Sequence, residues 1–298
     1  MSEKWEFSDV ENEFYIYLQK TAGNDVLDPL RSLQLTDPQC DKQKTACLEN
    51  LKLIFESLTI PFFLLQIGSS QCLHTLVKKL QEKAADGCDL SLAVATHLFN
   101  EKYYLAAVES ISPTFQLIHE KSFVKPQLQT LYKLGMSRFY GCLEEASKEL
   151  LKILICEDLT RLDTLDSIGK RIGRSNCTTL KNRITSDQQQ YNLMLSEAYD
   201  ENILNKGYQI EQYTELFECL SGFQRAASDF SSLKTLESGR HLVIHRSSVI
   251  DVKYLSEVSS LQSVGDKLLV SAQDIYGWQN SLVSYFTDLI RYVDAEVS

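Results

Sequence analysis

Residues 125–155 contain the stretch that decides the fold, KPQLQTLYKLGMSRFYGCLEEASKELLKILI. Its apolar residues recur every three or four positions, which is the spacing of an α-helical face. They fall on two sides of that helix, as expected of a helix packed between neighbours. The apolar positions are Leu128, Leu131, Leu134, Phe139, Cys142, Leu143, Ala146, Leu150 and Leu154. We therefore predict a long buried helix over 125–155 and an all-α fold.

Further helical patterns flank this stretch on both sides. Ser8 and Glu11 form a capping box that starts an N-terminal helix. A short helix precedes Asp37, and a longer helix over 41–58 meets Pro61, which we expect to end it or kink it. Other helix-like patterns cover 70–84, 90–100, 103–120, 158–172, 178–204, 208–230 and 250–296.

These patterns favour a helical architecture over an all-β one. With 5 prolines and 12 glycines, the chain lacks the frequent turns that an all-β fold requires. We predict a multi-helix bundle, or an elongated array of helical hairpins, with about 9–12 helices.

Residues 231–249 are the segment where we expect a boundary between two parts of the chain. It combines turn residues with HLVIH at 241–245, where a short strand could form. We interpret it as a linker between a main helical bundle (1–230) and a C-terminal helical hairpin (250–298), with a single domain as the alternative. The chain ends within or just beyond a helix, as expected of a piece of a longer rod.

The composition is that of an acidic globular protein. The formal net charge of −10 opposes binding to the phosphate backbone of nucleic acids. The N-terminus, MSEKWEF, lacks the apolar core of a signal peptide. The strongest apolar run, Ile60–Ile67, is far shorter than the ~20 residues of a membrane-spanning helix. We expect a cytoplasmic protein, with the nucleus as alternative, that is not secreted, has no transmembrane segment and binds no nucleic acid.

Eight cysteines occur without a C-x-x-C pair. Most fall at helical apolar positions, where free thiols are buried. This usage indicates a reducing compartment. The cysteines are Cys40, Cys47, Cys72, Cys88, Cys142, Cys156, Cys177 and Cys219.

Two motifs come close to known chemical sites without matching them. His241 and His245 lie four residues apart, as on a zinc-binding helix face, but Leu242 stands where a zinc protease has glutamate. GKRIG at 169–173 has three residues between its glycines, where a phosphate-binding loop has four. We therefore predict no catalytic residue, no cofactor and no metal.

One local basic patch stands out against the acidic background. Its residues lie within a short segment without an intervening acid. Such a patch suits an acidic partner or a phosphoinositide head group, or it is a solvated face. The patch residues are Lys170, Arg171, Arg174, Lys181 and Arg183.

Residues 92–111, LAVATHLFNEKYYLAAVESI, read as two helices joined by a tight turn. This hairpin resembles those of vesicle-tethering subunits of the exocyst and Golgi-tether type, and also tetratricopeptide hairpins. Residues 131–154 and 165–172 resemble the N-terminal rod of an exocyst subunit, so the resemblance covers about 90–175. It implies a subunit of a cytosolic assembly that docks transport vesicles.

Two functions remain open from the sequence. The first is a non-enzymatic interaction or scaffold subunit of an intracellular multiprotein complex, which binds other subunits through Tyr-rich helix faces. The alternative is an enzyme or small-molecule binder with a pocket inside a helical bundle. His97 with Glu101, and His119 with Glu120, are the local pairs that this alternative would use.

Overall fold

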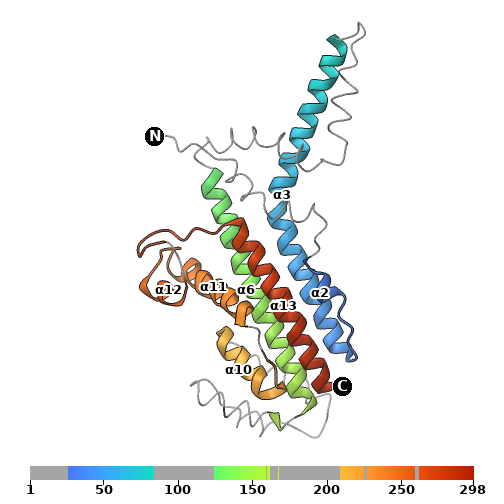
Figure 1. The fold of residues 1–298 in the computed structure, drawn as a ribbon, viewed down its shortest axis with the longest axis vertical. Helices are drawn as coiled ribbons and strands as arrows, with labels where there is room; N and C mark the ends of the chain where they lie inside the picture. The colour runs from blue at the N-terminus through green and yellow to red at the C-terminus, as the bar shows by residue number, and fades with distance from the viewer. Residues whose placement is uncertain are drawn as a thin grey trace. The chain divides into compact units, whose positions relative to one another are not determined.

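Helices make up the regular structure of the residues that the structure describes. The computed structural model describes residues 26–83, 124–158, 160–161, 167, 209–224, 227–258 and 262–298. They form seven helices: α2 (Asp28–Arg31), α3 (Pro38–Lys83), α6 (Val124–Glu157), α10 (Ile210–Ser221), α11 (Ala227–His245), α12 (Val252–Glu257) and α13 (Ala272–Val297) (Figure 1). Within these ranges no strand forms beyond one antiparallel bridge between Val249 and Lys267. The predicted all-α fold is confirmed.

The described residues divide into two compact units. Unit 1 contains 55–83, 124–135 and 269–276. Unit 2 contains 26–54, 136–158, 160–161, 167, 209–224, 227–258, 262–268 and 277–298. The predicted division into a bundle of 1–230 and a hairpin of 250–298 stays a prediction.

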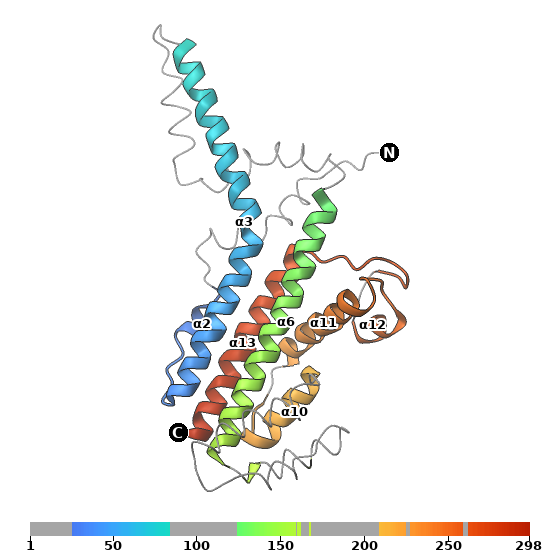
Figure 2. The ribbon, with the colours of Figure 1, turned by 180° about the vertical axis from the view of Figure 1, so that it is seen from behind.

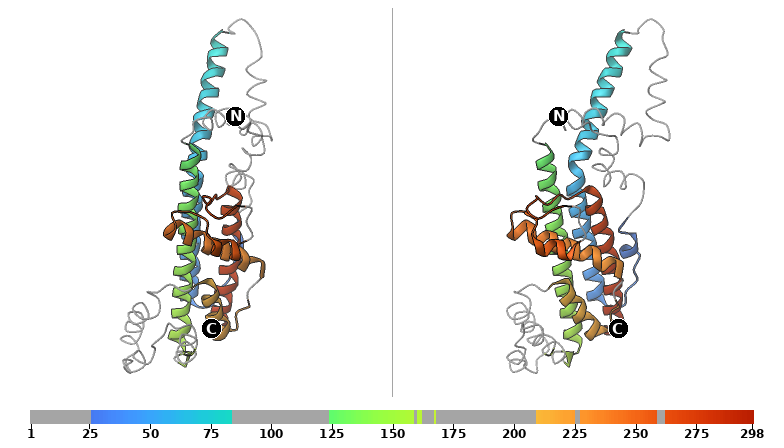
Figure 3. Two further views of the ribbon diagram at one scale, coloured as in Figure 1. Left: turned by 90° about the vertical axis from the view of Figure 1, so that its left-hand side faces the viewer. Right: turned by 60° about the vertical axis from the view of Figure 1, so that its left-hand side comes forward.

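The core of unit 2 forms where α6 packs beside α13. Figures 2 and 3 show the unit 2 portions of these helices side by side. Just beyond α6, Arg161 Nη2 pairs with Glu296 Oε2 at 3.0 Å near the end of α13, so the two helices run in the same direction. Each buried leucine or phenylalanine contributes about 1.5–3 kcal/mol. The buried apolar side chains include Phe139, Leu143, Leu150 and Leu154 on α6, and Leu282, Phe286, Leu289, Ile290 and Val293 on α13.

An aromatic cluster attaches α10 to α13. Gly222 ends α10 with φ of +70°, a left-handed conformation that glycine adopts without steric cost. The next residue, Phe223, is buried and packs edge-on against the rings of Tyr285 and Tyr292, at centroid distances of 5.7 and 5.6 Å. Edge-to-face pairs of this kind add about 0.5–1.5 kcal/mol each to the burial of the rings.

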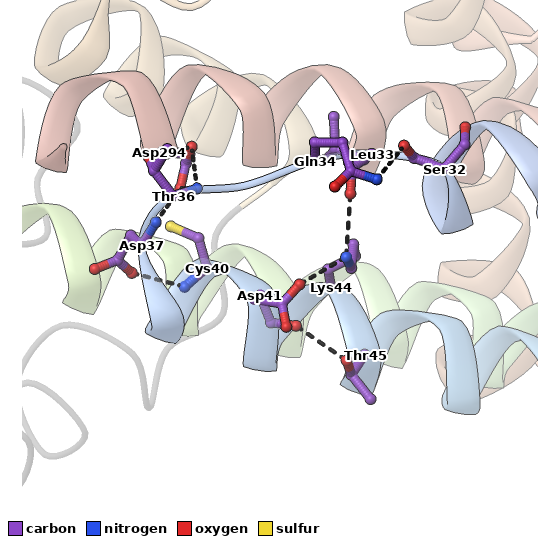
Figure 4. Close-up of polar contacts among 10 residues, drawn as sticks. All are labelled: Ser32, Leu33, Gln34, Thr36, Asp37, Cys40, Asp41, Lys44, Thr45 and Asp294. Carbon is purple, nitrogen blue, oxygen red and sulfur yellow. Dashed lines mark hydrogen bonds and ion pairs between the residues drawn. The ribbon is translucent and has the colours of Figure 1, made fainter.

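A buried carboxylate ties the start of α3 to the end of α13 (Figure 4). Asp294 accepts hydrogen bonds from the backbone N–H of Thr36 at 3.1 Å and of Asp37 at 2.7 Å. The Thr36 hydroxyl donates to the same carboxylate at 3.0 Å. Asp37 in turn accepts from the backbone N–H groups of Gln39 and Cys40, both at 2.8 Å, and so caps α3.

In unit 1, a glutamine side chain forms hydrogen bonds with both backbone groups of a single residue. Gln129 Nε2 donates to the carbonyl of Val270 at 2.9 Å, and its Oε1 accepts from the N–H of Val270 at 3.0 Å. Both backbone groups of Val270 are thereby satisfied. The start of α6 is therefore joined to the segment that leads into α13.

Most of the long predicted helix is confirmed, with one exposed exception. α6 spans Val124–Glu157 and contains the predicted stretch 125–155. The six apolar positions from Phe139 onward are buried, whereas Leu134 is 55% exposed. The two-sided burial of α6 agrees with a helix packed between neighbours.

Of the two outcomes expected at Pro61, an end of the helix or a kink, the end is wrong and the kink stays a prediction. α3 begins at Pro38 and continues through Pro61 to Lys83. A proline inside a helix removes one backbone hydrogen bond at a cost of about 3 kcal/mol. Twenty-three helical residues precede Pro61 and twenty-two follow it within Pro38–Lys83, so the helix continues on both sides of the proline.

The predicted strand at 241–245 is also wrong. These residues form the last turns of α11, which covers most of the segment 231–249 predicted as a linker. Its serines and glycine lower the intrinsic helix propensity. Burial of Leu233, Leu236 and Leu242 outweighs that cost.

Several predicted helices lie outside the described residues. They are the N-terminal helix from Ser8 and the stretches 90–100, 103–120 and 178–204. Within the part of the chain that the structure describes, no helix combines the length and apolar character needed to cross a membrane.

Candidate functional site

The predicted basic patch lies outside the described residues. This holds for all five of its members, Lys170, Arg171, Arg174, Lys181 and Arg183, and for the GKRIG segment at 169–173. The pairs His97 with Glu101 and His119 with Glu120 lie outside them as well. Of the residues considered for chemistry, His241 and His245 are described.

The structure instead shows a polar pocket in unit 2. It has a volume of about 380 Å³ and is formed by α6, α10, α11 and α12. α11 contacts both α10 and α12, and Figure 1 shows α10 and α11 next to α6. The lining residues are Tyr140, Glu144, Gln209, Glu211, Lys234, Glu237, Ser238, Arg240, His241, Leu242, Asp251, Lys253, Tyr254 and Glu257.

The polar face of α11 forms one side of this pocket. Lys234, Glu237 and His241 lie three and four residues apart, so they share a helical face. The buried Leu242 of the same helix also lines the pocket. Interpreting 231–249 as a linker hid this face, although the spacing of its charged residues was the signal that could have revealed it.

Glu237 is the carboxylate that α6 and α10 both contact. Its Oε1 accepts from the hydroxyl of Tyr140 at 2.8 Å and from the backbone N–H of Ile210 at 3.2 Å. Ile210 is the first residue of α10, so Glu237 also satisfies a free N–H at that helix start.

Burial controls the protonation of Glu237 and Tyr140. It raises the pKa of Glu237, the two hydrogen bonds lower it, and the neighbouring charges of Glu211 and Glu257 raise it further. Burial also raises the pKa of Tyr140, and the charge of Glu237 adds to that shift. The Tyr140 hydroxyl therefore stays protonated at neutral pH and acts as a donor.

The basic side chains of the pocket are held in different ways. Lys234 Nζ lies 2.7 Å from Glu211 Oε1, and this hydrogen bond raises the pKa of Lys234. The guanidinium carbon of Arg240 lies 4.8 Å from the centroid of the Tyr140 ring, a cation–π contact. Lys253 Nζ is 3.8 Å from Glu257 Oε1, a long ion pair.

A strained corner places α12 at the pocket. Ser247 and Ser248 have φ of 53° and 62°, which is unfavourable for residues with a Cβ. Lys267 Nζ donates to the carbonyl of Ser247 at 2.9 Å, and the N–H of Leu268 donates to that of Ser248 at 2.7 Å. These bonds hold the corner, after which Asp251 caps α12 by accepting from the N–H of Tyr254 at 2.8 Å.

No family model, curated protein or solved structure matches this chain. The resemblance to vesicle-tethering subunits therefore stays an expectation, and its hairpin at 92–111 lies outside the described residues.

The two histidines are neighbours on α11, with ring centroids 4.9 Å apart. Burial, His245 and Lys253 lower the pKa of His241, so its ring is neutral at pH 7. Arg246 also contributes positive charge there. Such charges oppose a metal cation, and within the described residues no group of three potential ligands gathers. The prediction of no metal site at this pair stays a prediction.

The described cysteines partly follow the predicted pattern of buried thiols. Cys40, Cys47 and Cys142 are buried and free, Cys156 is half-buried, and Cys219 is exposed. Burial raises the pKa of both Cys40 and Cys47 to about 12. A thiol with such a pKa is a poor nucleophile at neutral pH, because little thiolate forms.

Proposed function

We propose that this chain is a non-enzymatic helical interaction subunit of an intracellular multiprotein complex. The observation that carries the proposal is an open polar pocket flanked by large exposed aliphatic side chains. Ile244 and Val252 are 49% and 71% exposed. Ile244 follows the pocket residue His241 by one helical turn, and Val252 lies between the pocket residues Asp251 and Lys253.

This combination has the composition of a protein-binding surface. An exposed valine or isoleucine gains about 1.5–3 kcal/mol when a partner buries it. Charged groups beside it add specificity and favour correct encounter more than affinity. Arg240, which lines the pocket, adds a residue type that is enriched among those that dominate the binding energy of interfaces.

The cellular setting is a further part of the proposal. The resemblance of residues 92–111 supports a role in vesicle tethering or transport, in the cytoplasm, with the nucleus as the alternative. The acidic net charge of −10 supports partners other than nucleic acid. The basic patch from Lys170 to Arg183 is proposed as a second contact, for an acidic partner or a phosphoinositide.

Affinity purification with matched variants tests the proposal. Tagged wild-type chain, the double variant Ile244→Asp/Val252→Asp and the control Leu53→Asp are expressed in the native cell, and stoichiometric partners are quantified by mass spectrometry. Leu53 on α3 is 57% exposed, which makes it a matched apolar control. We expect partners that the double variant loses and the control keeps. A wild-type chain that is purified alone, or partners unaffected by the double variant, would overturn the proposal.

A second candidate, a small-molecule binder, is favoured by the pocket's volume. About 380 Å³ falls within the range of ligand sites. A thermal-shift screen of metabolites against wild type and Glu237→Gln tests it. A ligand that stabilises the wild type and not the variant would support this candidate over the first.

A further inference from the structure

The pocket holds more carboxylates than basic side chains. Five acids line it against three lysines and arginines, and His241 is neutral at pH 7. The acids are Glu144, Glu211, Glu237, Asp251 and Glu257, and the basic residues are Lys234, Arg240 and Lys253. The excess alone does not define a site, so the pairing of each group matters.

Glu237 forms no ion pair among the described residues, although the charge of Lys234 acts on it at longer range. Glu211 pairs with Lys234 at 2.7 Å, and Glu144 pairs with Lys148 at 3.2 Å. Among the described residues, no lysine or arginine pairs with Glu237, whose partners are a hydroxyl and a backbone N–H.

The geometry leaves one oxygen of Glu237 available. Both of its hydrogen bonds fall on Oε1. Within the described residues Oε2 has no hydrogen-bond partner, and the atom is accessible to solvent. The bonds to Tyr140 and Ile210 fix the carboxylate, which lowers the entropy cost of accepting a ligand.

A second fixed carboxylate lies on the neighbouring helix. Ser238, the residue after Glu237, donates its hydroxyl to Glu257 Oε2 at 2.7 Å. The cation nearest to Glu257 is Lys253, at the long distance of 3.8 Å. Two consecutive residues of α11 therefore place two acceptors in the same cavity. Glu237 contributes its own carboxylate, and Ser238 holds the carboxylate of Glu257 through its hydroxyl.

We propose that this pocket binds the ammonium or guanidinium group of a lysine or arginine side chain presented by a partner protein. Glu237 Oε2 accepts from the cationic group, and Glu257 provides the second negative charge. The inference rests on the proposed function and names the partner chemistry of that surface. A charged hydrogen bond of this kind is roughly twice as strong as a neutral one.

The surroundings favour a side chain on a peptide over a free amine. Ile244 and Val252 are exposed beside the pocket, and the apolar stem and neighbouring residues of a basic peptide would cover them. A free amine has no such surface to bury. The net charge of −10 also steers basic segments toward this protein.

Peptide titrations followed by NMR of the full chain test the proposal. The probes are the peptide acetyl-Gly-Leu-Arg-Leu-Gly-amide and the same peptide with citrulline, which has nearly the shape of arginine without its charge. Methylguanidine represents the free small cation. Glu237→Gln is the test variant, and Asp288→Asn, which removes a carboxylate of α13 outside the pocket lining, is the matched control.

We expect the arginine peptide to bind wild type at least about tenfold more tightly than the citrulline peptide. Glu237→Gln should abolish this preference, and Asp288→Asn should retain it. Equal binding of the two peptides, an unchanged preference in Glu237→Gln, or no response to the arginine peptide at millimolar concentration would overturn the proposal. Binding of methylguanidine as tight as that of the peptide would overturn the assignment to a partner side chain.

Two safeguards keep the outcome decisive. If Glu237→Gln fails to fold, Glu257→Gln takes its place, with a reduced preference as the expected result. Partners that are lost in Ile244→Asp/Val252→Asp but bind without charge preference would refute this inference and leave the proposed function standing.

Discussion

Asp294 accepts a hydrogen bond from the backbone N–H of Asp37 at 2.7 Å, although the two residues are 257 positions apart. Three further hydrogen bonds reach the same carboxylate, which is only 8% exposed, from Thr36. The Asp294 side chain therefore fastens the end of α13 to the residues that lead into α3.

Removal of this carboxylate should destabilise unit 2. Asp294→Ala leaves the N–H groups of Thr36 and Asp37 without their acceptor, and each loss of a partly buried partner costs about 1–3 kcal/mol. We expect a decrease of about 2–4 kcal/mol in the free energy of unfolding, measured by urea denaturation. Asp288→Ala breaks an exposed pair with Arg291 on the same helix and should cost less than about 1 kcal/mol. Similar losses in both variants would contradict the role of Asp294.

Two glycines should respond to alanine in opposite ways. Gly222→Ala places a Cβ on a residue with φ of +70° and should destabilise the protein by about 1 kcal/mol. Gly141 lies inside α6, is exposed, and has open space where a Cβ would be. Gly141→Ala should therefore stabilise by up to about 1 kcal/mol. Thermal unfolding of both variants checks the signs, and a stabilising Gly222→Ala would refute the left-handed end of α10.

Glu237 should make stability depend on pH. Since burial raises its pKa, the native state binds more protons than the unfolded chain between the ordinary and the raised pKa. The free energy of unfolding then falls as pH rises through that window. Glu237→Gln removes this titration, so the stability of wild type relative to the variant should fall as the pH rises from the ordinary carboxyl pKa through the raised pKa of Glu237. Urea denaturation at several pH values measures it, and a constant or rising difference would contradict the assignment.

The cysteines should differ in reactivity. Burial raises the pKa of Cys40 and Cys47 to about 12, whereas Cys219 is exposed. At a pH of about 8, we expect iodoacetamide to modify Cys219 at least about a hundredfold faster than Cys40 or Cys47. Peptide mapping by mass spectrometry follows each site, and the urea-unfolded chain, where the rates should converge, is the control. Equal rates in the native protein would show that Cys40 and Cys47 are accessible.

The helical class and the main helix of unit 2 could be predicted from sequence alone. α6 follows from a pattern within 31 consecutive residues, because helical burial repeats every three to four positions. The continuation of α3 through Pro61 could not be predicted in this way. The effect of a proline is judged from its immediate neighbours, whereas the helix extends for several turns on both sides. α11 was missed for a related reason, because tertiary burial of Leu233 and Leu236 overrides a weak local propensity.

The candidate site depends on contacts that no local pattern contains. Tyr140 and Glu237 are 97 positions apart, and Ile210 reaches the same carboxylate from a third helix. Local periodicity, capping and composition determined that the chain is helical and acidic, and that its eight cysteines form no C-x-x-C pair. Only the tertiary structure decided which carboxylates are paired, buried or open, because hydrogen bonds and desolvation depend on neighbours brought together by folding.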